Sequence, residues 1–223
     1  ATAGLNPGDV AYPAGGFAGR YGAIFRRGEL AAIDPASRRI KLSSGRDMGY
    51  DYLILATGVT TAFYGVKGAA EHTFGLYTRT DAIVLRDHLM AGFERLSVDS
   101  GDLNITVVGG GATGVELAGT LAELRRTVLG ATFPDVDPAR VCVRLVEMAP
   151  HLLGPFHPKL QEYAKAQLLA RGVDVRLDTR IGEVTADQVR LVHGEDLPSD
   201  ITVWAAGVAA GPGVAGWGLP QGK

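Results

Sequence analysis

The stretch ITVVGGGATGVELAG, Ile105 to Gly119, joins an apolar β-branched run to a helical pattern through a glycine-rich turn. A GxGxxG string between a strand and an amphipathic helix predicts a dinucleotide site. Gly109 permits the tight turn, Gly111 lets the backbone approach a pyrophosphate, and Gly114 lets the helix pack closely on the strand. The free N–H groups and the dipole of the helix N-terminus favour the phosphates. We therefore expect Gly109, Gly110, Gly111, Ala112, Thr113 and Gly114 to bind a dinucleotide.

An acidic residue follows the next apolar run, as a ribose site requires. The run VRLV ends directly before Glu147, which we expect to accept hydrogen bonds from the adenosine ribose. The spacing from Gly114 exceeds the usual interval of about 20 residues, and a proline-containing insertion at 130–140 accounts for the excess. Residues 148–150 hold no arginine that could accept a 2′-phosphate, so we expect NADH to be preferred over NADPH.

The sequence around this turn alternates between strand and helix patterns. The expected elements are strand 103–108, helix 112–128, strand 141–146, helix 158–171, strand 173–177, strands 180–185 and 188–192, and strand 201–205. Such an alternation predicts an α/β fold with a Rossmann-type, doubly wound parallel sheet.

The N-terminal third has a different pattern, without a helix of comparable length. We expect a loop over 1–20, a β-meander with strands at 23–26, 30–33 and 39–42, and an apolar strand at 50–55. Residues 59–79 are interpreted as a linker. Thr80 and Asp81 are expected to cap a following helix whose apolar face includes Leu85, Leu89, Phe93 and Leu96.

The composition excludes several other functional classes. The net charge of −2 gives no electrostatic reason to expect nucleic acid. The single cysteine, Cys142, cannot form an internal disulfide, and the five histidines have no metal-ligand spacing, so we expect no metal. The 31 glycines are about twice the usual share, which favours tight turns and close approach of the backbone to a ligand.

Two further stretches concern the extent of the chain. The first residues, ATAG, and the last, GLPQGK, suggest an internal fragment of a longer protein. The charge-free stretch 201–220 has the length of a membrane span, but its glycines and prolines favour a buried strand followed by a loop.

Three motifs, in this order, resemble those of the type II NADH dehydrogenases, within the superfamily of flavoproteins with two dinucleotide-binding domains. They are YDYLILATG at 50–58, VVGGGATGVELAG at 107–119 and TVWAAGV at 202–208. Weaker agreement occurs at 28–34 and 152–156, so the resemblance extends over nearly the whole chain.

The resemblance implies a division of the chain and a set of ligands. It implies a partial FAD-binding domain at 1–78, an NADH-binding Rossmann domain at 79–208 and the start of a return to the FAD domain at 209–223. It implies FAD near Leu30, Ala56, Thr57 and Gly58, and the nicotinamide of NADH near Glu116, Ala206 and Gly207. The FAD fingerprint and the quinone-binding region would belong to the parent enzyme outside this chain.

The resemblance also implies a reaction. Hydride passes from NADH to FAD, and electrons then pass to a quinone-type acceptor; no catalytic side chain is expected, because the cofactors carry the chemistry. The fragment alone is expected to be inactive. A cytoplasmic location is expected, with a bacterial parent on the cytoplasmic face of the inner membrane, and a homodimer of the parent stays open.

Other interpretations stay open as well. The chain could belong to another FAD- and NAD-dependent reductase, such as a ferredoxin or nitrite reductase flavoprotein, or act as a non-enzymatic NAD(H)-binding module. Simpler roles also exist for single residues. Glu116 could only favour the dipole of the first helical turn, Cys142 could be an inert buried thiol, and Arg125 and Arg126 could form a solvated helix end.

Overall fold

The computed structural model describes residues 8, 11–211 and 213–219. These residues form two compact units, which are described separately. Unit 1 contains Thr61–Val208, and unit 2 contains Gly8–Thr60 together with Ala209–Lys223. The predicted domain boundaries at 78 and 208 stay predictions.

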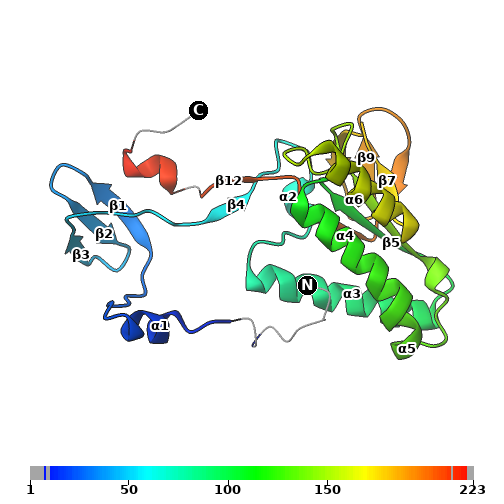
Figure 1. Ribbon diagram of the computed structural model, residues 1–223, viewed down its shortest axis with the longest axis horizontal. Coiled ribbons are helices and arrows are strands. Elements are labelled where there is room, and N and C mark those ends of the chain that lie inside the picture. The colour runs from blue at the N-terminus through cyan, green and yellow to red at the C-terminus, as the bar shows by residue number, and fades with distance from the viewer. Residues whose placement is uncertain (1–7, 9–10, 212, 220–223) are drawn as a thin grey trace. The chain divides into compact units, whose positions relative to one another are not determined.

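Unit 1 is built on a parallel four-stranded sheet in the order β11-β5-β6-β7. Figure 1 labels β5 and β7 of this sheet. The strands are β5 (Leu103–Val108), β6 (Val141–Val146), β7 (Asp174–Arg176) and β11 (Ile201–Trp204). Helix α4 (Ala112–Leu124) connects β5 to β6, and α6 (Pro158–Ala170) connects β6 to β7. The prediction of a Rossmann-type α/β fold on a parallel sheet is confirmed.

Different elements pack against the two faces of this sheet. Alternate strand residues such as Ile105, Val143 and Val203 join one apolar cluster with α3 (Arg79–Val98), α4 and α6. The residues between them, including Val108, Val146 and Trp204, pack against a three-stranded antiparallel sheet. Both faces are buried, as the nearly continuous apolar runs of the parallel strands require.

The antiparallel sheet comes from one contiguous stretch of the chain. Its order is β10-β9-β8, from β8 (Ile181–Val184), β9 (Gln188–Leu191) and β10 (Asp196–Pro198). The first two strands were expected, whereas β10 was missed because it is short and ends at a proline.

Unit 2 contains the predicted β-meander, but its strands differ in part from those expected. Strands β1 (Leu30–Asp34) and β2 (Arg39–Leu42) confirm the expectation, and β3 (Asp47–Gly49) completes the sheet. Residues 23–26 form no strand, and the loop expected over 1–20 includes helix α1 (Ala14–Arg20). A short 3-10 helix, η3 (Val214–Trp217), also belongs to this unit.

The strand expected at 50–55, before Ala56-Thr57-Gly58, is absent. Residues 50–58 have no regular structure, and Tyr52 and Ile54 are 94% and 89% exposed. No strand of the described chain pairs with them, so their backbone lacks the hydrogen-bonded ladder that an apolar strand requires.

The segment between residues 59 and 79 is more ordered than the predicted linker. It contains β4 (Val59–Thr61), which pairs with β12 (Val208–Ala210), and α2 (Ala69–His72). Single bridges join Lys67 to Glu183 and Phe74 to Val203. A linker pattern missed these contacts because all of them involve residues more than 100 positions away.

Two helix ends differ from the predictions. Helix α3 is capped by Thr78 rather than Thr80, because the Thr78 side chain accepts from the N–H of Asp81 and the Asp81 side chain accepts from the N–H of Thr78. The helix expected to end at 128 changes after Leu124 into a π-helical turn, η1 (Arg125–Leu129), followed by α5 (Gly130–Thr132).

Arg125 is a structural residue and not a solvated helix end. Its guanidinium donates to the carbonyl oxygens of Val141 at 3.0 Å and Arg171 at 2.7 Å. It therefore ties α4 to β6 and to the C-terminus of α6, where a cation also favours the helix dipole. Cys142 is partly buried, in contrast to the buried thiol that was expected.

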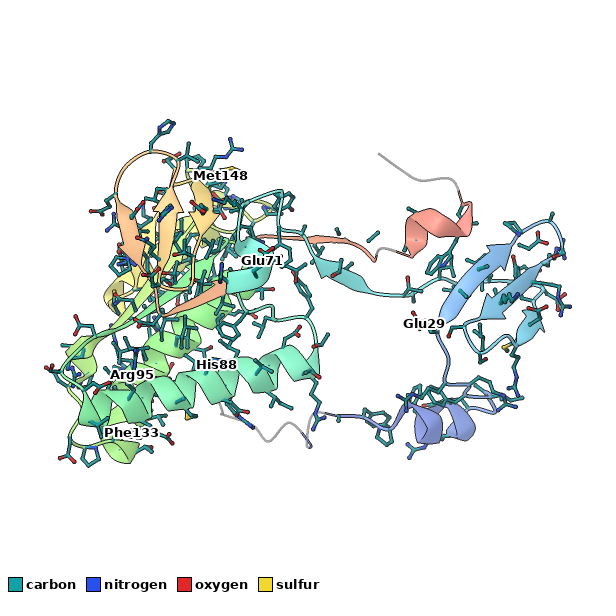
Figure 2. All side chains as sticks on the ribbon, turned by 180° about the vertical axis from the view of Figure 1, so that it is seen from behind. Glu29, Glu71, His88, Arg95, Phe133 and Met148 are labelled. Carbon is teal, nitrogen blue, oxygen red and sulfur yellow. The ribbon has the colours of Figure 1, made fainter. Side chains whose placement is uncertain are left out.

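We expect unit 1 to lose stability in acid through Asp200. Burial raises the pKa of this carboxyl, but hydrogen bonds from the Asn104 backbone and from Arg95 (labelled in Figure 2) leave it below the usual 3.8. A lowered folded-state pKa contributes stability above the unfolded pKa, and this contribution disappears as the pH falls through the folded value.

The Asp200→Asn variant should therefore lose on the order of 1 kcal/mol at pH 7, since Asp200 is about one-third exposed and solvent weakens the interaction. Its deficit should shrink below about pH 4. Denaturant unfolding at several pH values measures this, with the exposed Asp135→Asn as control. A deficit that stays constant between pH 7 and pH 3 would contradict the assignment.

Candidate functional site

The glycine-rich turn lies at the C-terminal end of β5, where ligands bind in open α/β sheets. Gly109 has φ +107°, and a Cβ there would lie 2.6 Å from the Cα of Ala206. A Cβ on Gly114 would overlap the carbonyl oxygen of Gly109. Gly111 is the N-cap of α4, with open space where a side chain would begin. The turn therefore needs glycine at 109 because of the backbone conformation there, and at 114 because of the close packing. At 111 the turn leaves open space for a ligand.

Glu147 directly follows β6 and contacts this turn. Its Oε2 accepts a hydrogen bond from the Gly110 N–H at 2.5 Å, and its Oε1 accepts from the Ala149 N–H at 2.7 Å. A Cβ on Gly110 would approach the Glu147 side chain within 3.0 Å, so the second glycine of the turn makes room for the carboxylate. The side chain is fixed beside the turn, and each oxygen keeps a further lone pair for a ligand hydroxyl.

A cavity of about 330 Å³ opens next to these residues, entirely within unit 1. The ends of three parallel strands contribute to its lining through Gly109, Glu147 and Ala206. Its remaining walls are Tyr64, Val66, Val108, Val146, Met148, Thr179, Arg180, Ile181 and Trp204. The cavity is mostly apolar with a few polar groups, as nucleotide-sized sites usually are. Met148, labelled in Figure 2, follows Glu147 after the end of β6.

The other predicted ligand residues lie in several places. Ala112 and Thr113 begin α4 next to the turn. Gly207 follows Ala206, and the Tyr77 hydroxyl donates to its carbonyl oxygen at 3.5 Å. Burial raises the pKa of Tyr77, with a further contribution from Tyr64, so this hydroxyl stays protonated at neutral pH.

Glu116 is exposed and lies beyond the first turn of α4, so the interaction expected there with the helix dipole is wrong. It lines a separate groove between α4 and α6 instead. The residues predicted to contact FAD, namely Leu30, Ala56, Thr57 and Gly58, belong to unit 2. Leu30 is half-buried at the start of β1, and residues 56–58 are exposed, with Gly58 at φ +75°.

The sequence interpretation missed part of the cavity wall. Thr179, Arg180 and Ile181 follow β7, so the position of this strand end beside that of β6 could have indicated them. Tyr64 and Val66 occupy the segment interpreted as a linker and carried no such signal. Among the described residues, no group of histidine, cysteine and acidic side chains could hold a metal ion.

The sequence profile described as pyridine nucleotide-disulphide oxidoreductase matches residues 19–220. The chain belongs to this family. It is 33% identical over 171 residues to a type II NADH:quinone oxidoreductase of Mycobacterium tuberculosis, covering 72% of this chain and 37% of that protein. It is 32% identical over 213 residues to the Staphylococcus aureus type II enzyme, covering 92% and 52%. The chain thus spans about half or less of these relatives.

Solved structures share the fold. NDH2 from Plasmodium falciparum in complex with NADH superposes with a TM-score of 0.80 at 18% identity, over 87% of this chain and 43% of that one. A ferredoxin reductase from Rhodopseudomonas palustris superposes with a TM-score of 0.77 at 23% identity, over 99% and 50%. No helix in the described part of the chain is long and apolar enough to cross a membrane.

Proposed function

We propose that this chain is the NADH-binding part of an FAD-dependent NADH:quinone oxidoreductase. The observation that carries the proposal is the contact between the glycine-rich turn and Glu147 at the mouth of the cavity. The relatives that are 32% and 33% identical are named for NADH and quinone, which favours these substrates over ferredoxin. We also propose residues 79–208 as the NADH domain, with 1–78 and 209–223 as parts of the FAD domain.

The residues present fit the pyrophosphate and the adenosine ribose of NADH. The open space at Gly111 and the free N–H groups at the start of α4 would bind the phosphates. Glu147 would accept hydrogen bonds from the ribose hydroxyls, in an orientation set by its two backbone donors. The apolar walls at Val108, Val146 and Ile181 would exclude water from the adenosine.

The flavin is assigned to Leu30 and residues 56–58. Residues 56–58 are exposed and Gly58 has a positive φ, so their backbone can lie close to a planar ring. When bound, FAD would supply the redox chemistry that links NADH to the quinone in the proposed reaction. We propose that Ala206 and Gly207 line the nicotinamide end, so that the chain supplies placement rather than an acid or base. Glu116 lines the separate groove between α4 and α6, so we do not assign it to this end.

Replacing Glu147 with glutamine tests the proposal. The variant should bind NADH about ten- to a hundredfold more weakly, because charged hydrogen bonds to the ribose become neutral ones. Calorimetric titration of the 223-residue chain with NADH measures the loss. The control is Glu123→Gln, which removes the same charge from an exposed position on α4. Unchanged NADH affinity in Glu147→Gln would contradict the ribose assignment.

Two further outcomes would overturn the wider proposal. A folded chain that binds neither NADH nor NADPH would exclude a functional dinucleotide site. For the acceptor, the full-length protein supplied with FAD should oxidise NADH faster with a soluble quinone than with ferredoxin. The opposite preference would reassign it to the reductases that the second structural match represents.

A further inference from the structure

Arg180 lies in the wall of the same cavity as Glu147, although it is far from it in the sequence. The two chain segments are joined directly. The Thr179 N–H donates to the carbonyl oxygen of Glu147 at 3.0 Å, and the Asp178 N–H donates to that of Ala149 at 3.1 Å. The carbonyl oxygen of Arg180 accepts from the Val192 N–H at 2.8 Å. The backbone that carries Arg180 is therefore fixed beside the proposed ribose site.

The charged side chains around Arg180 differ in whether they have a hydrogen-bond or ion-pair partner. The Glu147 carboxylate is held by two backbone donors. Arg180 is exposed, and within the described residues no carboxylate lies within ion-pair distance of its guanidinium. The nearby Arg176, in contrast, is paired with Asp174 and Glu195. The other charged group on the segment is Asp178, which is exposed. The cavity is thus lined by a carboxylate of fixed orientation, that of Glu147, and by the guanidinium of Arg180, which has no ion-pair partner among the described residues.

We propose that Arg180 is a specificity-determining residue that recognises the 2′-substituent of the adenosine ribose; this inference rests on the proposed NADH site. Glu147 repels a 2′-phosphate and favours the free hydroxyl. A guanidinium matches a phosphate with two parallel hydrogen bonds. The absence of arginine from residues 148–150 therefore does not leave the site without a cation. Because of Arg180, the site still binds NADPH weakly. Removing the charge of Glu147 alone increases the affinity for NADPH.

A two-by-two set of variants tests this. Glu147→Gln, Arg180→Met and the double variant are titrated with NADH and with NADPH in the 223-residue chain. Arg180→Met should weaken NADPH binding about tenfold and change NADH binding less than about twofold. Glu147→Gln should strengthen NADPH binding, and the double variant should lose that gain. Arg126→Met, an exposed arginine on η1, removes the same charge elsewhere and should leave both affinities unchanged.

The outcomes separate this inference from the proposed function. If Arg180→Met weakens both dinucleotides equally, Arg180 acts on a shared group, for example by stacking on the adenine, and the specificity role is wrong. An undiminished NADPH gain in the double variant would also overturn it. If the folded wild-type chain binds neither dinucleotide, the proposed function fails, and this inference fails with it. If NADH binding is saturable, the proposed NADH site stands, and a contrary result with the variants overturns only the role of Arg180.

Discussion

Replacing Gly114 with alanine should destabilise unit 1 by about 2–3 kcal/mol and weaken NADH binding. The added Cβ would overlap the carbonyl oxygen of Gly109, and neither backbone can move without displacing α4 from the turn. Because α4 also supplies the proposed phosphate-binding N–H groups, the same displacement would disturb the dinucleotide site. Urea unfolding and an NADH titration measure the two effects.

The matched control lies five residues further along the same helix. Gly119 in α4 would place its Cβ 3.7 Å from Leu168, which is an ordinary van der Waals distance. Gly119→Ala should therefore stabilise unit 1 by about 0.5–1 kcal/mol, because alanine costs less conformational entropy in a helix. Two identical substitutions in one helix should differ in sign. The packing assignment of Gly114 would be wrong if both variants gained stability.

Replacing Trp204 with alanine should cost unit 1 about 3–5 kcal/mol. The side chain is 2% exposed at the end of β11, and it packs between the parallel sheet and the antiparallel sheet. Its ring lies 5.8 Å from that of Phe63, and its Nε1 donates to the carbonyl oxygen of Ala62 at 2.8 Å. Its removal leaves a large cavity in the smaller apolar cluster and releases the segment that leads to Tyr64.

Trp204→Phe separates packing from the hydrogen bond. Phenylalanine keeps most of the apolar volume but leaves Ala62 without its donor, so we expect a loss of about 1 kcal/mol. Denaturant unfolding of both variants is the measurement. Equal losses would mean that the hydrogen bond to Ala62, and not the packing of the buried ring, accounts for the lost stability.

The sequence was most informative where structure depends on neighbouring residues. Strands β5 and β6 and helices α4 and α6 were expected within a few residues of their observed bounds. Each is an apolar run with a regular period, next to glycine or proline residues that interrupt regular structure. Gly110 contacts Glu147 because adjacent parallel strands end at the same sheet edge. That the two residues bind a ligand stays a prediction.

The failures share a different cause. Residues 50–55 have a strand pattern but no partner strand in the described chain, and a strand forms only with a hydrogen-bonded neighbour. Arg125 was interpreted as solvated because its acceptors, on β6 and after α6, are 16 and 46 residues away. The same reasoning missed Arg180, whose place beside Glu147 depends on the pairing of β6 with β7.

The sequence by itself determined the turn, the helix that follows it and the acid that ends the next strand, because glycine conformation and apolar period act over a few residues. Only the tertiary structure decided which residues close the cavity around them. Tyr64, Arg180 and Trp204 come from three separate segments, and they meet because β5, β6, β7 and β11 pair in parallel and the antiparallel sheet covers one face. Such pairing is decided by burial of apolar surface between distant segments, which no short stretch of sequence specifies.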